Sequence, residues 1–109
     1  MFEIIMQYNP YADEPIDMVQ INQCIDLVWD DYTVMNYNFL VLSRTDKASY
    51  LQVKISEDAQ FVVETLLDGK VYQLLLDDKE TVSAIFKGYF MDFDFDITVF
   101  TDITHTIQA

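Results

Sequence analysis

The chain has 109 residues, of which 51% are hydrophobic and 15% aromatic, so it can fill one buried core but is too short for two. Its 19 acidic residues against 6 basic residues give a formal net charge of -13 and a pI near 4.1. A field of this sign repels nucleic acid and anionic membranes and speeds the encounter with basic proteins. We therefore expect a single domain over residues 1–109, with no nucleic acid or membrane as a direct partner.

The charge is distributed unevenly along the sequence. All six cations lie between residues 44 and 87, whereas residues 1–43 carry seven acids and no lysine or arginine. Residues 88–109 carry four more aspartates and again no lysine or arginine. Two explanations stay open: a surface selected to meet a basic partner, or an organism whose proteins are acidic in general.

The first part of the chain predicts a strand followed by a helix. The apolar residues 2–7 are bounded by a turn at Asn9-Pro10 and favour a strand or an extended arm. From Pro15 to about Asp31, apolar residues recur at spacings of three and four, which predicts an amphipathic helix with an acidic N-terminal end. Cys24 lies near its apolar face, where a buried structural thiol is favoured over a nucleophile.

Four apolar runs predict a central meander of short strands over residues 39–42, 50–55, 61–67 and 71–76. In the second run Leu51, Val53 and Ile55 alternate with polar or aromatic residues, as in a half-buried strand. Asp68-Gly69 between the last two runs predicts a tight hairpin, because a two-residue primed turn requires positive φ angles.

A second helix is predicted to begin at Asp77 or Asp78 and to end between Gly88 and Met91. With Asp77 as N-cap, Glu80 completes a capping box, and an apolar stripe of Val82, Ile85, Phe86 and Tyr89 follows. Alternating aspartates and phenylalanines then predict a last strand over residues 92–100. The element order predicts an α+β fold: an antiparallel β-sheet meander with two helices packed on one face.

The last predicted strand places Asp92, Asp94 and Asp96 at alternate positions, about 6.6 Å apart on one face. An EF-hand loop would need glycine at the sixth position and glutamate at the twelfth, but this sequence has Ile97 and Ile103 there, which excludes that calcium site. The row of carboxylates is either the charged solvent face of a strand, which blocks edge-to-edge aggregation, or a surface that binds lysines and arginines of another protein.

Glu64 is an acid within an otherwise apolar run. If both faces of the sheet are covered, the carboxylate requires a partner such as Lys54 or Arg44 on a neighbouring strand, because a lone buried charge is costly. If one face is open, Glu64 can instead serve recognition, together with a polar and aromatic surface made of Tyr50, Gln52, Tyr72 and Gln73.

No arrangement of catalytic residues is recognisable. His105 is the only histidine and lies in the C-terminal tail, and the two glycines, Gly69 and Gly88, form no phosphate-binding loop. We expect no catalytic residues, metal or cofactor, although a small hydrolase using paired carboxylates stays open. The N-terminus lacks a basic leader and a cleavage site, and a single cysteine fits a reducing compartment, so we expect a cytoplasmic protein.

The central stretch resembles small bacterial immunity proteins of polymorphic toxin systems. The resemblance rests on FLVLSR (39–44), SYLQVKI (49–55), QFVVETLLDGKVYQLLLDD (60–78) and ETVSAIFKGYF (80–90). In such families strands containing "YLQV" and "VVE" precede a helix with an "F..Y" pair. The resemblance implies a cytoplasmic inhibitor that neutralises a cognate toxin by occluding its active site, and it does not include the acidic strand.

The sequence therefore favours a non-enzymatic inhibitor of a basic protein, most simply a toxin immunity protein. The residues expected to bind the partner are Asp92, Asp94, Asp96, Asp30, Asp31, Glu64 and Tyr72. A nucleic-acid mimic that inhibits a DNA-binding or restriction protein is the alternative, since the same charge supports it equally. A homodimer through an exposed sheet face is also open.

Overall fold

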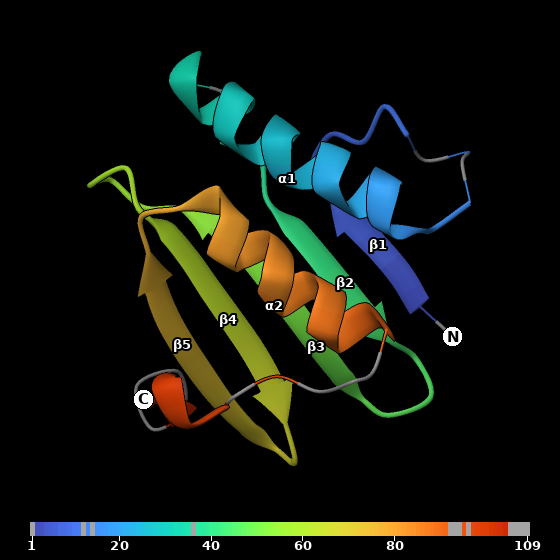
Figure 1. The fold of residues 1–109 in the computed structure, drawn as a ribbon, viewed down its shortest axis with the longest axis vertical. Helices are drawn as coiled ribbons and strands as arrows, with labels where there is room; N and C mark the ends of the chain where they lie inside the picture. The colour runs from blue at the N-terminus through green and yellow to red at the C-terminus, as the bar shows by residue number, and fades with distance from the viewer. Residues whose placement is uncertain are drawn as a thin grey trace.

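The computed structural model describes residues 2–11, 13, 15–35, 37–91, 95 and 97–104, and it confirms the α+β fold (Figure 1). One antiparallel sheet contains the strands in chain order: β1 (Phe2–Met6), β2 (Leu40–Arg44), β3 (Ser49–Ile55), β4 (Phe61–Leu67), β5 (Lys70–Leu76) and β6 (Thr101–Asp102). Helices α1 (Met18–Thr33) and α2 (Lys79–Met91) lie on the same face of this sheet.

The two helices begin at aspartates that accept hydrogen bonds from the first turn. Asp17 is the N-cap of α1, and its side chain accepts from the amide of Gln20 at 2.8 Å. At α2 the carboxylate of Asp78 accepts hydrogen bonds from the hydroxyl of Thr81 at 2.5 Å and from its amide at 2.9 Å, and these bonds lower the pKa of Asp78. Asp78 is therefore the residue that caps α2, and Thr81 is the residue whose amide it accepts from. The predicted capping box of Asp77 and Glu80 was wrong.

The hairpin between β4 and β5 forms at the predicted place. Asp68 and Gly69 both have positive φ angles, of 52° and 78°, as the primed turn requires. The resulting register pairs Glu64 with Gln73 and Thr65 with Tyr72.

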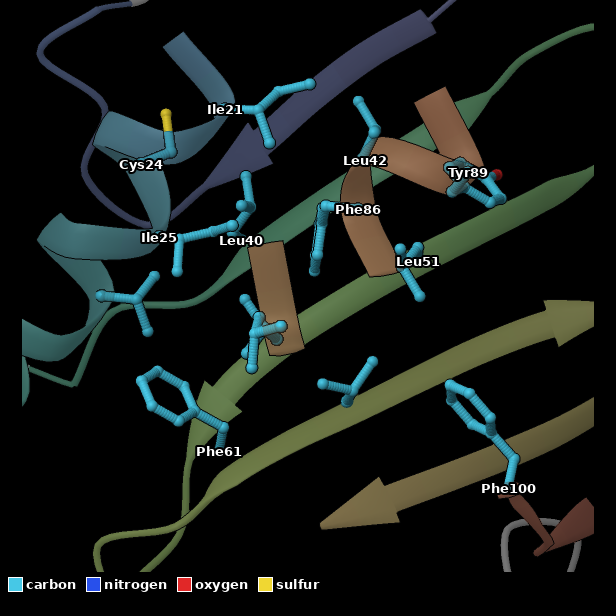
Figure 2. Packing of buried hydrophobic residues seen from close by; sticks show 14 residues of the cluster. Ile21, Cys24, Ile25, Leu40, Leu42, Leu51, Phe61, Phe86, Tyr89 and Phe100 are labelled. Carbon is cyan, nitrogen blue, oxygen red and sulfur yellow. The ribbon is translucent and has the colours of Figure 1, made fainter. Parts of the chain in front are cut away.

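Strand alternation divides the sheet into two faces. The face under the helices contributes Leu40, Leu42, Leu51, Val53 and Val63, all with no exposed surface, to a core completed by both helices (Figure 2). The opposite face, called the open face below, is covered by no helix among the described residues. It consists of the side chains of Glu3, Ile5, Val41, Ser43, Tyr50, Gln52, Lys54, Val62, Glu64, Leu66, Val71, Gln73, Leu75 and Thr101.

The end of the chain differs from the predicted strand over residues 92–100. Within the described part of that segment, Ile97–Val99 is a short 3-10 helix, and the amide of Phe100 donates to the carbonyl oxygen of Ile97 at 3.0 Å. Phe95 and Phe100 pack together, with their ring centroids 5.7 Å apart, and both contact the core. Among the residues described after α2, strand pairing is seen at β6, which is two residues long and pairs with Tyr72 and Gln73.

Candidate functional site

The seven residues predicted to bind a partner do not form one site. Asp92, Asp94 and Asp96 lie outside the described residues, so the acidic row stays a prediction. Phe95, which lies between Asp94 and Asp96 in the sequence, packs on the core. The centroids of the Phe95 and Tyr89 rings are 6.1 Å apart.

Glu64 and Tyr72 lie on opposite faces of the sheet. Tyr72 is on the face under the helices and packs against the core, so its assignment to the polar and aromatic surface was wrong. Glu64 lies on the open face between Gln52 and Gln73 in the strand register. Its carboxylate accepts a hydrogen bond from the hydroxyl of Tyr50 at 3.2 Å, and its expected partner Arg44 is instead bound to Asp46.

The contact with Glu64 also affects the ionisation of the Tyr50 phenol. Burial raises the pKa of the Tyr50 phenol, and the neighbouring Glu64 carboxylate raises it further. The phenol therefore stays neutral and keeps donating at physiological pH. The observed partner of Glu64 is thus a tyrosine. A cation, Lys54 or Arg44, was expected only if both faces of the sheet were covered, and no helix among the described residues covers this face.

Asp30 and Asp31 lie at the C-terminal end of α1, on the helix side of the sheet (Figure 1). Asp30 is exposed, whereas Asp31 is half-buried and its carboxylate accepts a hydrogen bond from the side-chain amide of Asn38 at 2.9 Å. Asn38 is itself buried and also binds the backbone of Tyr8 through both of its amide atoms. Asp31 thereby fixes the end of α1 to the segments that flank β1 and β2.

Side chains from four segments gather around this end of α1 and form a surface that we call the α1 corner. A groove of about 580 Å³ opens between α1 and the turn from β3 to β4, lined by Tyr32, Tyr37, Ile55, Ser56 and Glu57. The Tyr32 and Tyr37 rings meet edge to face at 6.1 Å, and the Tyr32 hydroxyl donates to the carbonyl oxygen of Glu57 at 3.4 Å. The α1 corner comprises these groove residues with Tyr8, Asp30, Asp31, Val34, Met35 and Asp58.

The α1 corner combines exposed apolar side chains with carboxylates. Val34 is 72% exposed and Met35 73%, and Tyr8 and Tyr37 are also more than half exposed. Val34, Met35 and Tyr37 follow closely on one another past the end of α1, and a group of exposed apolar side chains is typical of a binding surface. Glu57 lines the groove, and Asp30 and Asp58 are its exposed acidic neighbours in the chain segments that form the α1 corner. Lys79 on the neighbouring α2 is held by Asp26 in an ion pair.

The backbone at Met35 is strained. Its φ angle is 61°, in the left-handed region where glycine is favoured, and its amide donates to the carbonyl oxygen of Tyr32 to close the last turn of α1. A large side chain that is 73% exposed gains little from packing there. Packing of the Met35 side chain therefore does not offset the strain.

Replacing Met35 by glycine is expected to raise the free energy of unfolding by about 0.5–1 kcal/mol, because glycine adopts the left-handed conformation without steric cost. Thermal unfolding followed by circular dichroism measures the change. Met35→Ala is the matched control: it removes the side chain beyond Cβ but keeps the Cβ atom that strains the left-handed backbone, so no gain is expected. A glycine variant no more stable than the alanine variant contradicts the interpretation.

The described residues hold few features that suggest other chemistry. Cys24 is fully buried in the core, and His105 lies outside the described residues. Within the described ranges, no three histidine, cysteine or carboxylate side chains are grouped as metal ligands would be. Across the same ranges, no helix has the length and apolar character needed to cross a bilayer.

Sequence reasoning identified Asp30 and Asp31 but missed Tyr32, Tyr37, Val34 and Met35. The available signal was the run of apolar residues continuing past the helix end into a polar segment, where no strand or helix accounts for them. Comparison with known proteins adds no further assignment: no family model, curated protein or solved structure is significantly similar to this chain.

Proposed function

We propose that the protein is a binding protein that inhibits a basic protein partner, in the manner of an immunity protein that neutralises a toxin. The α1 corner is its docking surface. The observation that supports this proposal is the combination there of exposed aromatic and apolar side chains with a rim of carboxylates. The net charge of -13 extends the same preference to the molecule as a whole.

The energetics of protein interfaces fit this arrangement. Binding energy concentrates in aromatic and apolar groups that lose water at the centre of an interface, while charges at the rim set the association rate and the choice of partner. Tyr37 and Met35 offer the central groups, and Asp30 and Glu57 offer the rim. An acidic rim favours lysine and arginine on the partner and rejects anionic surfaces.

Inhibition of this kind requires no reaction on the inhibitor. A toxin that acts on nucleic acid presents cations in its cleft to hold phosphates, and a carboxylate surface can bind those cations in place of the substrate. The affinity then falls steeply as salt concentration rises, because ions screen the charges over about 8 Å at physiological ionic strength.

The aromatic centre is tested with a double variant, Met35→Ala with Tyr37→Ala. The wild type and the variant are used as bait in lysate of the source organism, bound proteins are identified by mass spectrometry, and the affinity of the purified partner is measured by calorimetry. We expect a basic partner that the wild type retains at low salt and that the variant binds at least tenfold more weakly. The control variant, Val19→Ala with Met91→Ala, removes equally exposed apolar groups elsewhere and is expected to bind normally.

The acidic rim is tested by neutralisation. Asp30→Asn with Glu57→Gln is expected to reduce the association rate about tenfold at low salt and to flatten its dependence on salt. Glu3→Gln with Asp13→Asn changes the net charge equally at exposed sites away from the α1 corner, so it controls for the overall field. Equal losses in both variants would show that no particular surface is used. A captured DNA-binding enzyme that duplex DNA displaces would favour the nucleic-acid mimic.

A further inference from the structure

The open face differs from the rest of the molecule in its charge. Of the 19 acidic residues in the chain, Glu3 and Glu64 are the ones whose side chains the described strands place on this face. Lys54 adds one cation, so the open face carries a formal charge near -1 within a chain of net charge -13. A basic partner would therefore gain little electrostatic attraction by binding to the open face.

The open face is also partly apolar. Val62 and Leu75 are directly paired across β4 and β5, and Lys54 pairs with Val62 from the other side. Ile5 near one edge is 45% exposed and Leu75 near the other is 52% exposed. Six side chains on this face are aliphatic, namely Ile5, Val41, Val62, Leu66, Val71 and Leu75, although Val62 and Val71 are themselves buried. Antiparallel sheets with one solvated face normally place polar side chains there, so this composition favours contact with another apolar surface.

We propose that a second copy of this chain covers the open face, with two sheets packed face to face as a symmetric dimer. The charge distribution favours a second copy over a basic partner on this face. Two molecules of net charge -13 repel one another through every acidic surface, and they approach at least cost through a face that is nearly neutral. This proposal is independent of the proposed function, since it uses the opposite side of the molecule.

The size of the open face suits a weak dimer. Five strands about 4.8 Å apart, two of five residues and three of seven at about 3.3 Å per residue, give a projected area on the order of 500 Å² per copy. This is below the roughly 800 Å² per partner of a standard interface, so we expect a weak dimer. Two sheets packed in this way lie about 10 Å apart.

Symmetry also allows the few charges on this face to be satisfied. In a two-fold dimer, a contact from one residue to another occurs twice. Lys54 of each copy can then lie opposite a carboxylate, Glu3 or Glu64, of the other. The α1 corner of each copy stays free on the outer side, because the helices lie on the opposite face of the sheet.

Sedimentation equilibrium of the full chain from 1 to 200 µM, at 50 and 500 mM NaCl, tests the proposal. We expect a monomer–dimer equilibrium whose dissociation constant falls or stays unchanged as salt rises, because salt screens the repulsion between two acidic molecules. This dependence is opposite to that expected for the basic partner, so the failure of one proposal is distinguishable from the failure of the other. A chain that stays monomeric at 200 µM in both salt concentrations overturns the dimer.

Charge insertion locates the interface. Ile5→Glu with Leu75→Glu is expected to weaken dimerisation at least 100-fold, since four added carboxylates would face one another. Val34→Glu with Met35→Glu adds the same charge at exposed apolar sites on the helix side and is expected to leave dimerisation within threefold of the wild type. Leu75→Gln is a second test that adds no charge at an exposed position, so it is not expected to prevent folding. It should weaken the dimer at least fivefold. A dimer kept in both open-face variants overturns the assignment, whatever the control does.

Discussion

Replacing Phe86 by alanine is expected to lower the free energy of unfolding by about 3–5 kcal/mol, the cost of deleting a fully buried aromatic ring and leaving a cavity. Phe86 has no exposed surface and lies between α2 and the central strands, close to Leu40 and Leu51 in Figure 2. A single small domain has a stability of the order of 5–15 kcal/mol, so this one change removes a large part of it. Urea unfolding followed by circular dichroism measures the loss.

The control for Phe86 is replacement by leucine, which keeps most of the apolar volume and is expected to cost less than half as much. Ile85, on the same helix but only partly buried, provides a second comparison as Ile85→Ala. If Phe86→Ala and Ile85→Ala were equally destabilising, the centre of the core would lie elsewhere along α2.

Replacing Asn38 by leucine is expected to cost about 3–5 kcal/mol, because several polar groups lose their partner at once. The Oδ1 atom of Asn38 accepts from the amides of Gln7, Tyr8 and Phe39 at 3.1, 3.3 and 2.9 Å. Its amide nitrogen donates to the carbonyl oxygen of Tyr8 and to the carboxylate of Asp31, both at 2.9 Å. Urea unfolding measures the change, and a loss below about 1 kcal/mol would show that water replaces these bonds.

Asn38→Asp is the near-isosteric companion. It keeps the three accepted bonds, loses both donated ones, and places a second carboxylate against Asp31. The repulsion raises the folded-state pKa of one carboxyl above its unfolded value, so stability lost at neutral pH is recovered as pH falls through that raised pKa. Combining the change with Asp31→Asn removes the charge pair, and the recovery at low pH should disappear.

The sequence predicted the sheet well because its signals are local. The alternation in residues 50–55 placed Leu51 and Val53 in the core and Tyr50 and Gln52 on the open face, as observed. The Asp68-Gly69 turn fixed the register of β4 and β5, since only residues tolerant of positive φ can occupy it. Each of these predictions depended on a few neighbouring residues.

The wrong prediction for residues 92–100 depended on contacts distant in the sequence, whereas the placement of Tyr72 overlooked a local pattern. Residues 92–100 alternate like a strand, yet Ile97–Val99 forms a 3-10 helix because Phe95 and Phe100 must both reach the core as the chain returns from α2 to β5. Tyr72 was grouped with its polar neighbours although alternation placed it with Thr65 across the hairpin, under the helices.

The α1 corner could be predicted only in part. Asp30 and Asp31 stood out as adjacent acids at the end of a predicted helix. The groove beside them requires Tyr32 from α1, Tyr37 after it and Glu57 from a turn 20 residues later to meet, and no local pattern indicates that meeting. The left-handed backbone of Met35 is likewise set by the closure of the helix end and not by residue type.

The strand order has a consequence for how the chain folds. Strands β2 to β5 are joined by short turns and pair with their sequence neighbours, so they can assemble without closing a long loop. The pairing of β1 with β2 must wait for the 33 residues between them, which include α1. We therefore expect a folding nucleus in the four central strands, with substitutions in β3 and β4 slowing refolding and substitutions in β1 mainly speeding unfolding.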